Sequence, residues 1–203
     1  MKLFDLTTLT IGVTAHATTQ AALAQHLPEA GGRLLGCWSS DVGVLNRVMV
    51  LREFDGWEPL QAAREKLLAS AEPLGCGAGL EGLDVGTYAL FPFLPAIGPA
   101  THGRCYELRT YGLKHGKLPA TIEAWQNAMP ARGALSPLVG AFYALDGDLS
   151  RFLNIRAYPS ADERSRVRAA AVAQGAWPPV GGPASLTHMT STLAIPAAFS
   201  PLQ

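Results

Sequence analysis

A carboxylate and a guanidinium stand two residues apart in a short strand-like stretch of this sequence. In CYELRTYGL (residues 105–113), Glu107, Arg109 and Tyr111 occupy alternate positions, and alternate residues of a strand point to the same face. A buried arginine can bind a carboxylate or polarise a carbonyl, and a glutamate whose pKa is shifted by burial can move a proton. We therefore treat Glu107 and Arg109 as candidate catalytic residues.

A second predicted strand, RFLNIRAY (residues 151–158), offers a matching set of side chains. If helices cover the face that carries Tyr106, Leu108 and Thr110, the candidate residues of both strands point into the interior of a barrel. The predicted ligand-binding residues are Tyr111, Phe152, Asn154, Arg156, Tyr158 and His188. The same cluster is also typical of a structural ion-pair network, because buried charges must be paired whether or not a ligand binds.

The histidines do not have the spacing of a metal site. None of the five lies three or four residues from another, as two metal ligands on one helix would. His188, on a predicted strand, could face the cavity as a base or an axial haem ligand, although a strand histidine is more often a hydrogen-bonded wall residue. No glycine-rich phosphate loop, nucleophile elbow or Asp-rich metal motif is present. We therefore predict no metal and no cofactor.

The chain contains an internal repeat with an offset of 104 residues. The segment GCWSSDVGVLNRVMVLREF (36–54) aligns with GAFYALDGDLSRFLNIRAY (140–158). The matched pairs include Gly43 and Gly147, Arg47 and Arg151, Arg52 and Arg156, and Pro92 and Pro196. Near the start of each copy the offset becomes about 99, so Thr8 and Thr10 would take the places of the glutamate and arginine described above. Only the second copy would then keep the polar lining.

Each copy is predicted to run strand, helix, strand, strand, helix, strand. In the second copy the strands are 105–113, 138–145, 151–158 and 186–195, and the helices begin near Gly116 and Ser160. This order is that of the ferredoxin-like fold. The predicted fold class is α+β, with tandem ferredoxin-like β-α-β-β-α-β repeats forming a pseudo-dimer, a barrel of two inward-facing sheets with helices outside. The predicted domains are residues 1–95, a degenerate repeat, and 105–203, joined by a linker at 96–104.

Composition and charge exclude several classes of partner. The 203 residues are 48% hydrophobic, and sixteen Lys and Arg balance sixteen Asp and Glu, so no surface for nucleic acid or an anionic membrane is predicted. No segment approaches the roughly 20 apolar residues of a membrane span. Residues 1–17 are predicted to form a strand rather than a signal peptide, and three widely spaced cysteines argue against a disulfide framework. A reducing, cytoplasmic location fits these features.

Several motifs together resemble the NIPSNAP family. They lie in YELRTYGLKHGKLPATIEAW (106–125) and LVGAFYALDGDLSRFLNIRAYPSADERSRVRAAAVAQGAWPP (138–179), and include the family's Tyr-Glu-Leu-Arg-x-Tyr strand, its Tyr-x-Ser helix start and the tryptophan after the second helix. The resemblance implies a dimeric α/β barrel, in a superfamily that includes small-ring isomerases, polyketide cyclases, haem-degrading enzymes and cofactor-independent monooxygenases. The N-terminal half resembles the family only through the internal repeat. The sequence departs from the family pattern at His115, Ser150, Asn154 and Arg156.

These observations support two main hypotheses. In the first, the protein binds a small, mostly apolar carbonyl or carboxylate compound in an interior barrel cavity, and could be an enzyme that needs no cofactor. In the second, it is a non-catalytic interaction or assembly protein whose barrel is filled by side chains. A third, weaker hypothesis is haem binding or degradation through His188. Because each half leaves strand edges open for pairing, we also expect a homo-oligomer.

Overall fold

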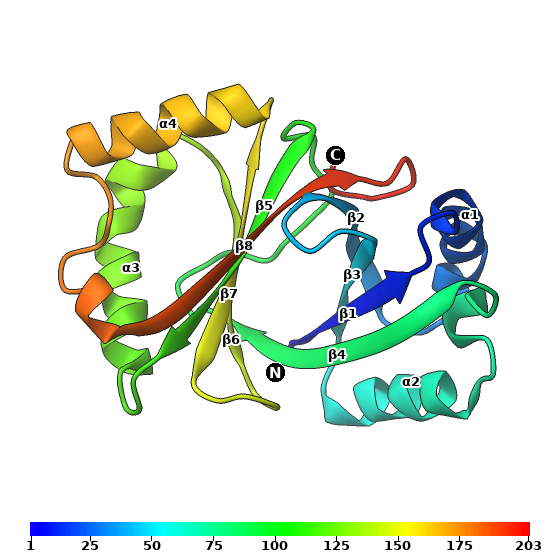
Figure 1. Cartoon of the computed structure of the whole chain (residues 1–203). Coiled ribbons are helices and arrows are strands. Elements are labelled where there is room, and N and C mark those ends of the chain that lie inside the picture. Colours follow the sequence, from blue (N-terminus) through cyan, green and yellow to red (C-terminus); the bar gives the residue numbers. More distant parts are fainter.

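The protein consists of two copies of one β-α-β-β-α-β unit, as shown in Figure 1 by a computed structural model of residues 1–203. The first unit comprises β1 (Leu3–Ile11), α1 (His16–His26), β2 (Arg33–Val42), β3 (Arg47–Phe54), α2 (Trp57–Ala69) and β4 (Leu80–Leu90). The second comprises β5 (Cys105–Leu113), α3 (Leu118–Gly133), β6 (Leu138–Ala144), β7 (Arg151–Tyr158), α4 (Ala161–Ala173) and β8 (Leu186–Pro196). None of the helices is long and apolar enough to cross a membrane.

The eight strands form one closed barrel in the order β1-β3-β2-β8-β5-β7-β6-β4. Each half supplies a four-stranded antiparallel sheet, with β1 and β3 central in the first and β5 and β7 central in the second. The two sheets join where β2 pairs with β8 and where β4 pairs with β6. In Figure 1 the helices α1 and α2 lie outside one sheet, and α3 and α4 lie outside the other. The predicted fold class, a tandem ferredoxin-like pseudo-dimer, is confirmed.

Local sequence signals explain several boundaries in the second half. Ser160 caps α4, because its Oγ accepts a hydrogen bond from the backbone N–H of Glu163 at 3.1 Å. Between β6 and β7, Gly147 has a φ of +66°, a left-handed conformation that glycine adopts without strain. Helix α3 contains Pro130 and continues to Gly133. A proline in the last turn removes a single hydrogen bond, which the packing of α3 tolerates.

The interior of the barrel is filled by apolar side chains from both halves. A cluster of 17 buried residues includes Phe4, Trp38 and Met49 from the first half and Tyr106 and Phe142 from the second. The rings of Phe4 and Phe142 meet edge to face at 5.1 Å, and those of Trp38 and Tyr106 meet at 5.4 Å. The prediction of an interior ligand cavity is therefore wrong, because the large side chains of the two sheets interdigitate there.

The ladder registers correct the offset between the two copies. Asp5 lies opposite Arg52, and Glu107 lies opposite Arg156. Because Arg52 and Arg156 correspond at an offset of 104, the counterpart of Glu107 is Asp5, at an offset of 102 (107 − 5). The predicted offset of 99 is wrong. The same comparison applies to the last strand of each half. Pro196 pairs with Trp38, and Leu90 pairs with Phe142, which is the counterpart of Trp38 in the repeat. The counterpart of Pro196 is therefore Leu90 and not Pro92.

Candidate functional site

The charged residues of β5 face the helices and not the barrel interior. Tyr106 and Leu108 belong to the apolar core inside the barrel, so Glu107, Arg109 and Tyr111 must point to the opposite face. The predicted direction of these side chains is therefore wrong. On this outer face, Arg164 and Arg168 of helix α4 pair with Glu107, the only carboxylate of the strand.

Glu107 is the centre of a cluster of cations. Its side chain is fully buried, and its Oε1 accepts hydrogen bonds from Arg109 Nη1 at 2.8 Å and from Arg164 Nη2 at 2.5 Å. The Oγ of Ser191 on β8 donates to the same oxygen at 2.9 Å. The Nη1 of Arg168 lies 3.6 Å from Oε2. One carboxylate therefore faces three guanidiniums, and the cluster has an excess of positive charge.

The surroundings of Glu107 keep it ionised. Burial opposes the charged form, but hydrogen bonds from Arg164 and Arg109 outweigh burial and lower the pKa of Glu107 to about 2. A carboxylate with this pKa cannot exchange a proton efficiently near neutral pH. Glu107 is thus suited to holding the arginines in place.

A pocket of about 290 Å³ lies beside this cluster, between the outer face of the second sheet and helices α3 and α4. Arg109, 13% exposed, and Arg168, 36% exposed, contribute its charged side. Its remaining lining is mostly aromatic and aliphatic: Tyr111, Thr121, Trp125, Phe152, Val172, Trp177, Pro178, Pro179, Gly182, Pro183, Leu186 and Met189. The pocket therefore combines apolar walls with two guanidiniums.

The aromatic wall is built by neighbouring strands and one helix. Tyr111 on β5 stacks on Phe152 of β7 with the ring centroids 4.8 Å apart, as their opposed positions in the ladder dictate. Trp125 on α3 packs edge-on against Phe152 at 5.3 Å and against Trp177 at 4.8 Å. The Nε of Arg109 donates to the hydroxyl of Tyr111 at 2.7 Å. This hydrogen bond links the guanidinium of Arg109 to the aromatic wall of the pocket.

The other predicted site residues lie outside this pocket. The amide of Asn154 donates to the backbone carbonyl of Arg109 at 3.3 Å, which secures the strand. Arg156 and Tyr158 are buried nearer to the far end of the sheet, where the hydroxyl of Tyr158 accepts a hydrogen bond from Arg132 at 3.3 Å. His188 is exposed, lies on the opposite face of β8 from Met189, and does not contact the pocket.

Sequence reasoning missed the contribution of helix α4. Arg164 and Arg168 are four residues apart, which places them on one face of the helix, while Arg166 points to solvent and pairs with Glu163. An arginine pair at this spacing opposite a strand glutamate was a usable signal. Trp125 and Trp177 also border the pocket.

The first half carries its own buried carboxylate at the equivalent position. Asp5 is fully buried and accepts from Arg52 at 3.0 Å and from Arg64 of α2 at 3.1 Å. Arg64 also donates to Asp146 of the second half at 3.1 Å, and Asp146 accepts from the hydroxyl of Thr87 at 2.6 Å. The prediction that the first half lacks the charges is therefore wrong, because it rested on the incorrect offset.

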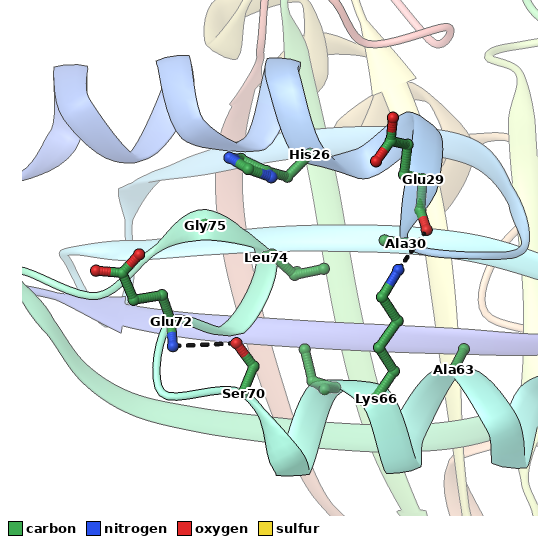
Figure 2. Close-up of a pocket in the computed structure, with 10 residues that line it drawn as sticks. His26, Glu29, Ala30, Ala63, Lys66, Ser70, Glu72, Leu74 and Gly75 are labelled. Carbon is green, nitrogen blue, oxygen red and sulfur yellow. Dashed lines mark hydrogen bonds between the residues drawn. The ribbon is translucent and has the colours of Figure 1, made fainter.

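The first half has a smaller and more polar pocket, shown in Figure 2. Its volume is about 150 Å³, and it lies between the end of α1 and the end of α2. Lys66, from α2, donates to the backbone carbonyl of Glu29 at 3.1 Å, while the N–H of Glu72 donates to Ser70. No Phe, Tyr or Trp lines it. The two halves thus differ in the character of their pockets.

No group of three or more His, Cys, Asp or Glu side chains is arranged to hold a metal ion.

Two ferredoxin-like sheets close into one barrel, with a helix-covered pocket on one side. This arrangement defines a fused, single-chain α/β barrel of the dimeric type. The NIPSNAP family model matches residues 4–73 and 106–201. The chain therefore belongs to the NIPSNAP family, and its N-terminal half matches the family directly.

Similar proteins agree with this assignment. A protein NipSnap homolog from Dictyostelium discoideum is 26% identical over 148 residues, which are 72% of this chain and 66% of that relative. A presumed monooxygenase from Lactobacillus acidophilus NCFM has the same fold, with a TM-score of 0.70 and 11% identity over 97% of this chain and 94% of its own. An anthrone oxidase-like protein aligns with a TM-score of 0.63 and 10% identity, over 96% and 91% of the two chains. At these identities the two structures show the fold alone.

Proposed function

We propose that the protein binds a small, mostly apolar compound with a carboxylate or carbonyl group in the pocket between the second sheet and helices α3 and α4. The observation that carries the proposal is the excess of guanidinium charge beside an aromatic wall in a pocket of about 290 Å³. This volume is near the lower limit of pockets that hold small ligands, roughly 300 Å³.

The two pocket arginines have donors to spare for such a ligand. A guanidinium has about five N–H donors, and Arg109 uses its Nε for Tyr111 and its Nη1 for Glu107. Arg168 has only a long contact to Glu107. An anionic group beside these two would lower the excess charge, and the apolar part of the ligand would lie against Trp125 and Phe152. We propose a binding role for Arg109 and a positioning role for Glu107.

Arg109→Met is expected to weaken the binding of an acidic ligand by about 10- to 150-fold, the value of a hydrogen bond to a charged group. The measurement is a thermal-shift screen of small aromatic and aliphatic acids, followed by titration of each hit against wild type and variant. The fold should persist, because Glu107 still accepts from Arg164 and Ser191.

The matched control is Lys66→Met, which removes the cation of the pocket in the first half. Hits should bind this variant as they bind wild type. A hit that survives Arg109→Met but disappears in Lys66→Met would contradict the proposed location, and hits that neither variant affects would contradict the role of both pockets.

A second candidate function is assembly, which the filled barrel favours. Strand β8 pairs with β2 only over Leu193–Pro196, and β4 pairs with β6 only over Tyr88–Leu90. The remaining lengths of both strands, 186–192 in β8 and 80–86 in β4, have one edge each without a strand partner, while Thr87 is bonded to Leu145 and Asp146. Free edges can pair with another copy of the chain. We propose that the protein forms a homo-oligomer through them.

Light scattering over micromolar concentrations is expected to show a mass above that of the monomer. Thr190→Lys should shift the protein toward the monomer, since a lysine on an edge strand opposes strand pairing. A strict monomer at every concentration would contradict assembly, and a mass that Thr190→Lys leaves unchanged would place the interface elsewhere than β8.

A further inference from the structure

Two buried arginines of the second half have no carboxylate partner. Arg132 on α3 is 2% exposed and Arg156 on β7 is 3% exposed. The single acidic side chain nearest to them in the sheet, Glu107, makes its ion pairs within 4.0 Å to Arg109, Arg164 and Arg168 and to neither of these two. Arg132 and Arg156 therefore lie buried between the sheet and the helices with no carboxylate at ion-pair distance.

The contacts of the two guanidiniums are few and neutral. Arg132 donates to Ser136 Oγ at 2.7 Å and to the hydroxyl of Tyr158 at 3.3 Å. Arg156 donates to the carbonyl of Ser136 at 3.4 Å and to the sulfur of Met129 at 3.8 Å. Both guanidiniums also lie over the ring of Trp177, at 5.9 and 5.4 Å from its centroid. Their common partners show that the two cations are neighbours.

The equivalent arginine of the first half has a carboxylate partner. Arg52 is the counterpart of Arg156 in the repeat, and it donates to Asp5 at 3.0 Å. It also donates to the carbonyls of Ala30 and Gly31 at 3.0 and 3.2 Å. The same strand position thus has a carboxylate and two strong acceptors in one half, and a weak carbonyl contact and a thioether in the other.

Burial of two like charges without a counter-ion is unfavourable. Burial, and next to it the charge of Arg132, lower the pKa of Arg156 to about 9. Arg156 therefore remains charged at neutral pH, and a buried guanidinium carries a desolvation cost that an anion of suitable geometry offsets. Guanidiniums bind oxyanions through paired N–H donors, which neutral acceptors do not match.

A groove of about 500 Å³ reaches Arg132, the neighbour of Arg156, although Arg156 itself is not among the residues that line it. Most of its lining comes from α4, including Arg168, and Arg132 of α3 and Trp177 complete it. The geometry points to an oxyanion-binding site in which Arg132 and Arg156 hold a compact phosphate-, sulfate- or carboxylate-type group beside Trp177. This site does not depend on the ligand proposed for the aromatic pocket, although Arg168 and Trp177 border both.

The test uses the full chain in Tris chloride buffer at neutral pH, with phosphate, sulfate and acetate added at ionic strength matched by sodium chloride. Phosphate is expected to raise the melting temperature of wild type in a saturable way, by roughly 5 °C at saturation. Line broadening of the phosphorus-31 signal of inorganic phosphate provides a direct measure of binding. The three anions identify which oxyanion geometry the site prefers.

Arg132→Met and Arg156→Met should each weaken phosphate binding at least about tenfold, since each removes one guanidinium fork. Both variants should melt no lower than wild type without phosphate, because an unneutralised buried charge is replaced by an apolar chain. Arg109→Met, in the aromatic pocket, and Arg166→Met, on the exposed face of α4, are the matched controls and should bind phosphate as wild type does.

Three results would overturn the inference. The first is that none of the three oxyanions has a saturable effect on wild type beyond that of chloride. The second is that Arg132→Met and Arg156→Met bind phosphate as wild type does. The third is that only Arg109→Met loses phosphate binding. The last result would assign the anion to the aromatic pocket. If either methionine variant fails to fold, the glutamine variant at the same position, Arg132→Gln or Arg156→Gln, replaces it, and the phosphorus-31 measurement on wild type still decides whether phosphate binds.

Discussion

Glu107→Gln is expected to destabilise the protein by about 3–5 kcal/mol, because it removes a fully buried carboxylate, the only one that pairs with this group of three arginines. The amide that replaces it can still accept hydrogen bonds but has no charge to offset Arg109, Arg164 and Arg168. For a chain of this length the loss corresponds to a decrease of roughly 10 °C in melting temperature. Thermal and urea unfolding at neutral pH measure it.

The matched control is Glu163→Gln, which removes an exposed glutamate from its ion pair with Arg166. An exposed pair contributes between zero and about 1 kcal/mol, so this variant should resemble wild type. Equal effects of the two substitutions would contradict the role that we assign to Glu107.

The same carboxylate gives the stability a defined acid dependence. The pKa of Glu107 is about 2 in the folded protein, against 4.5 as its ordinary value. Because the folded pKa is the lower one, ionised Glu107 stabilises the protein above about pH 5, and this contribution of about 3 kcal/mol is lost as the pH falls from about 4.5 to about 2. The difference in unfolding free energy between wild type and Glu107→Gln should therefore shrink over this range.

Trp38→Ala is expected to cost about 3–5 kcal/mol, since it removes a fully buried side chain from the interior of the barrel. Trp38 packs against Tyr106 of the other half at 5.4 Å. Both sheets share this interior, so we expect wild type and variant to unfold in one transition, with the variant melting roughly 10 °C lower. Differential scanning calorimetry measures both quantities.

Trp57→Ala is the control for the loss of an indole, because Trp57 at the start of α2 is 53% exposed. This variant should unfold within about 0.5 kcal/mol of wild type, as surface substitutions do. A cost for Trp38→Ala below about 1 kcal/mol would mean that the interior is hollow, and two separate transitions would mean that the halves fold independently.

The architecture was predictable because the repeat is visible in residue types. The matching of Arg52 with Arg156 and the alternating strands of the second half were enough for the fold class. The direction of β5 was not predictable in the same way. Alternation divides a strand into two sets of side chains, but when both faces are buried it does not indicate which set faces the barrel. The decisive contacts come from Arg164 and Arg168, on a helix more than fifty residues away.

The candidate site was predicted in part. Arg109, Tyr111 and Phe152 do line one pocket, since they lie on one face of neighbouring strands, whereas His188 faces the opposite way. The counterpart of Glu107 was misassigned, because β1 and β5 share few residue types. Only the ladder, in which Asp5 lies opposite Arg52, identifies it.

The covalent fusion of the two sheets has an evolutionary consequence. In a symmetric homodimer every mutation appears in both subunits, so the two copies of a site must change together. In a single chain the two copies can diverge independently. In the first half, Asp5 pairs with the strand arginine Arg52. In the second half, Glu107 pairs with three other arginines, and Arg156, the counterpart of Arg52, has no carboxylate at ion-pair distance. A single chain that carries two copies of the unit is thereby free of the constraint that symmetry places on a homodimer.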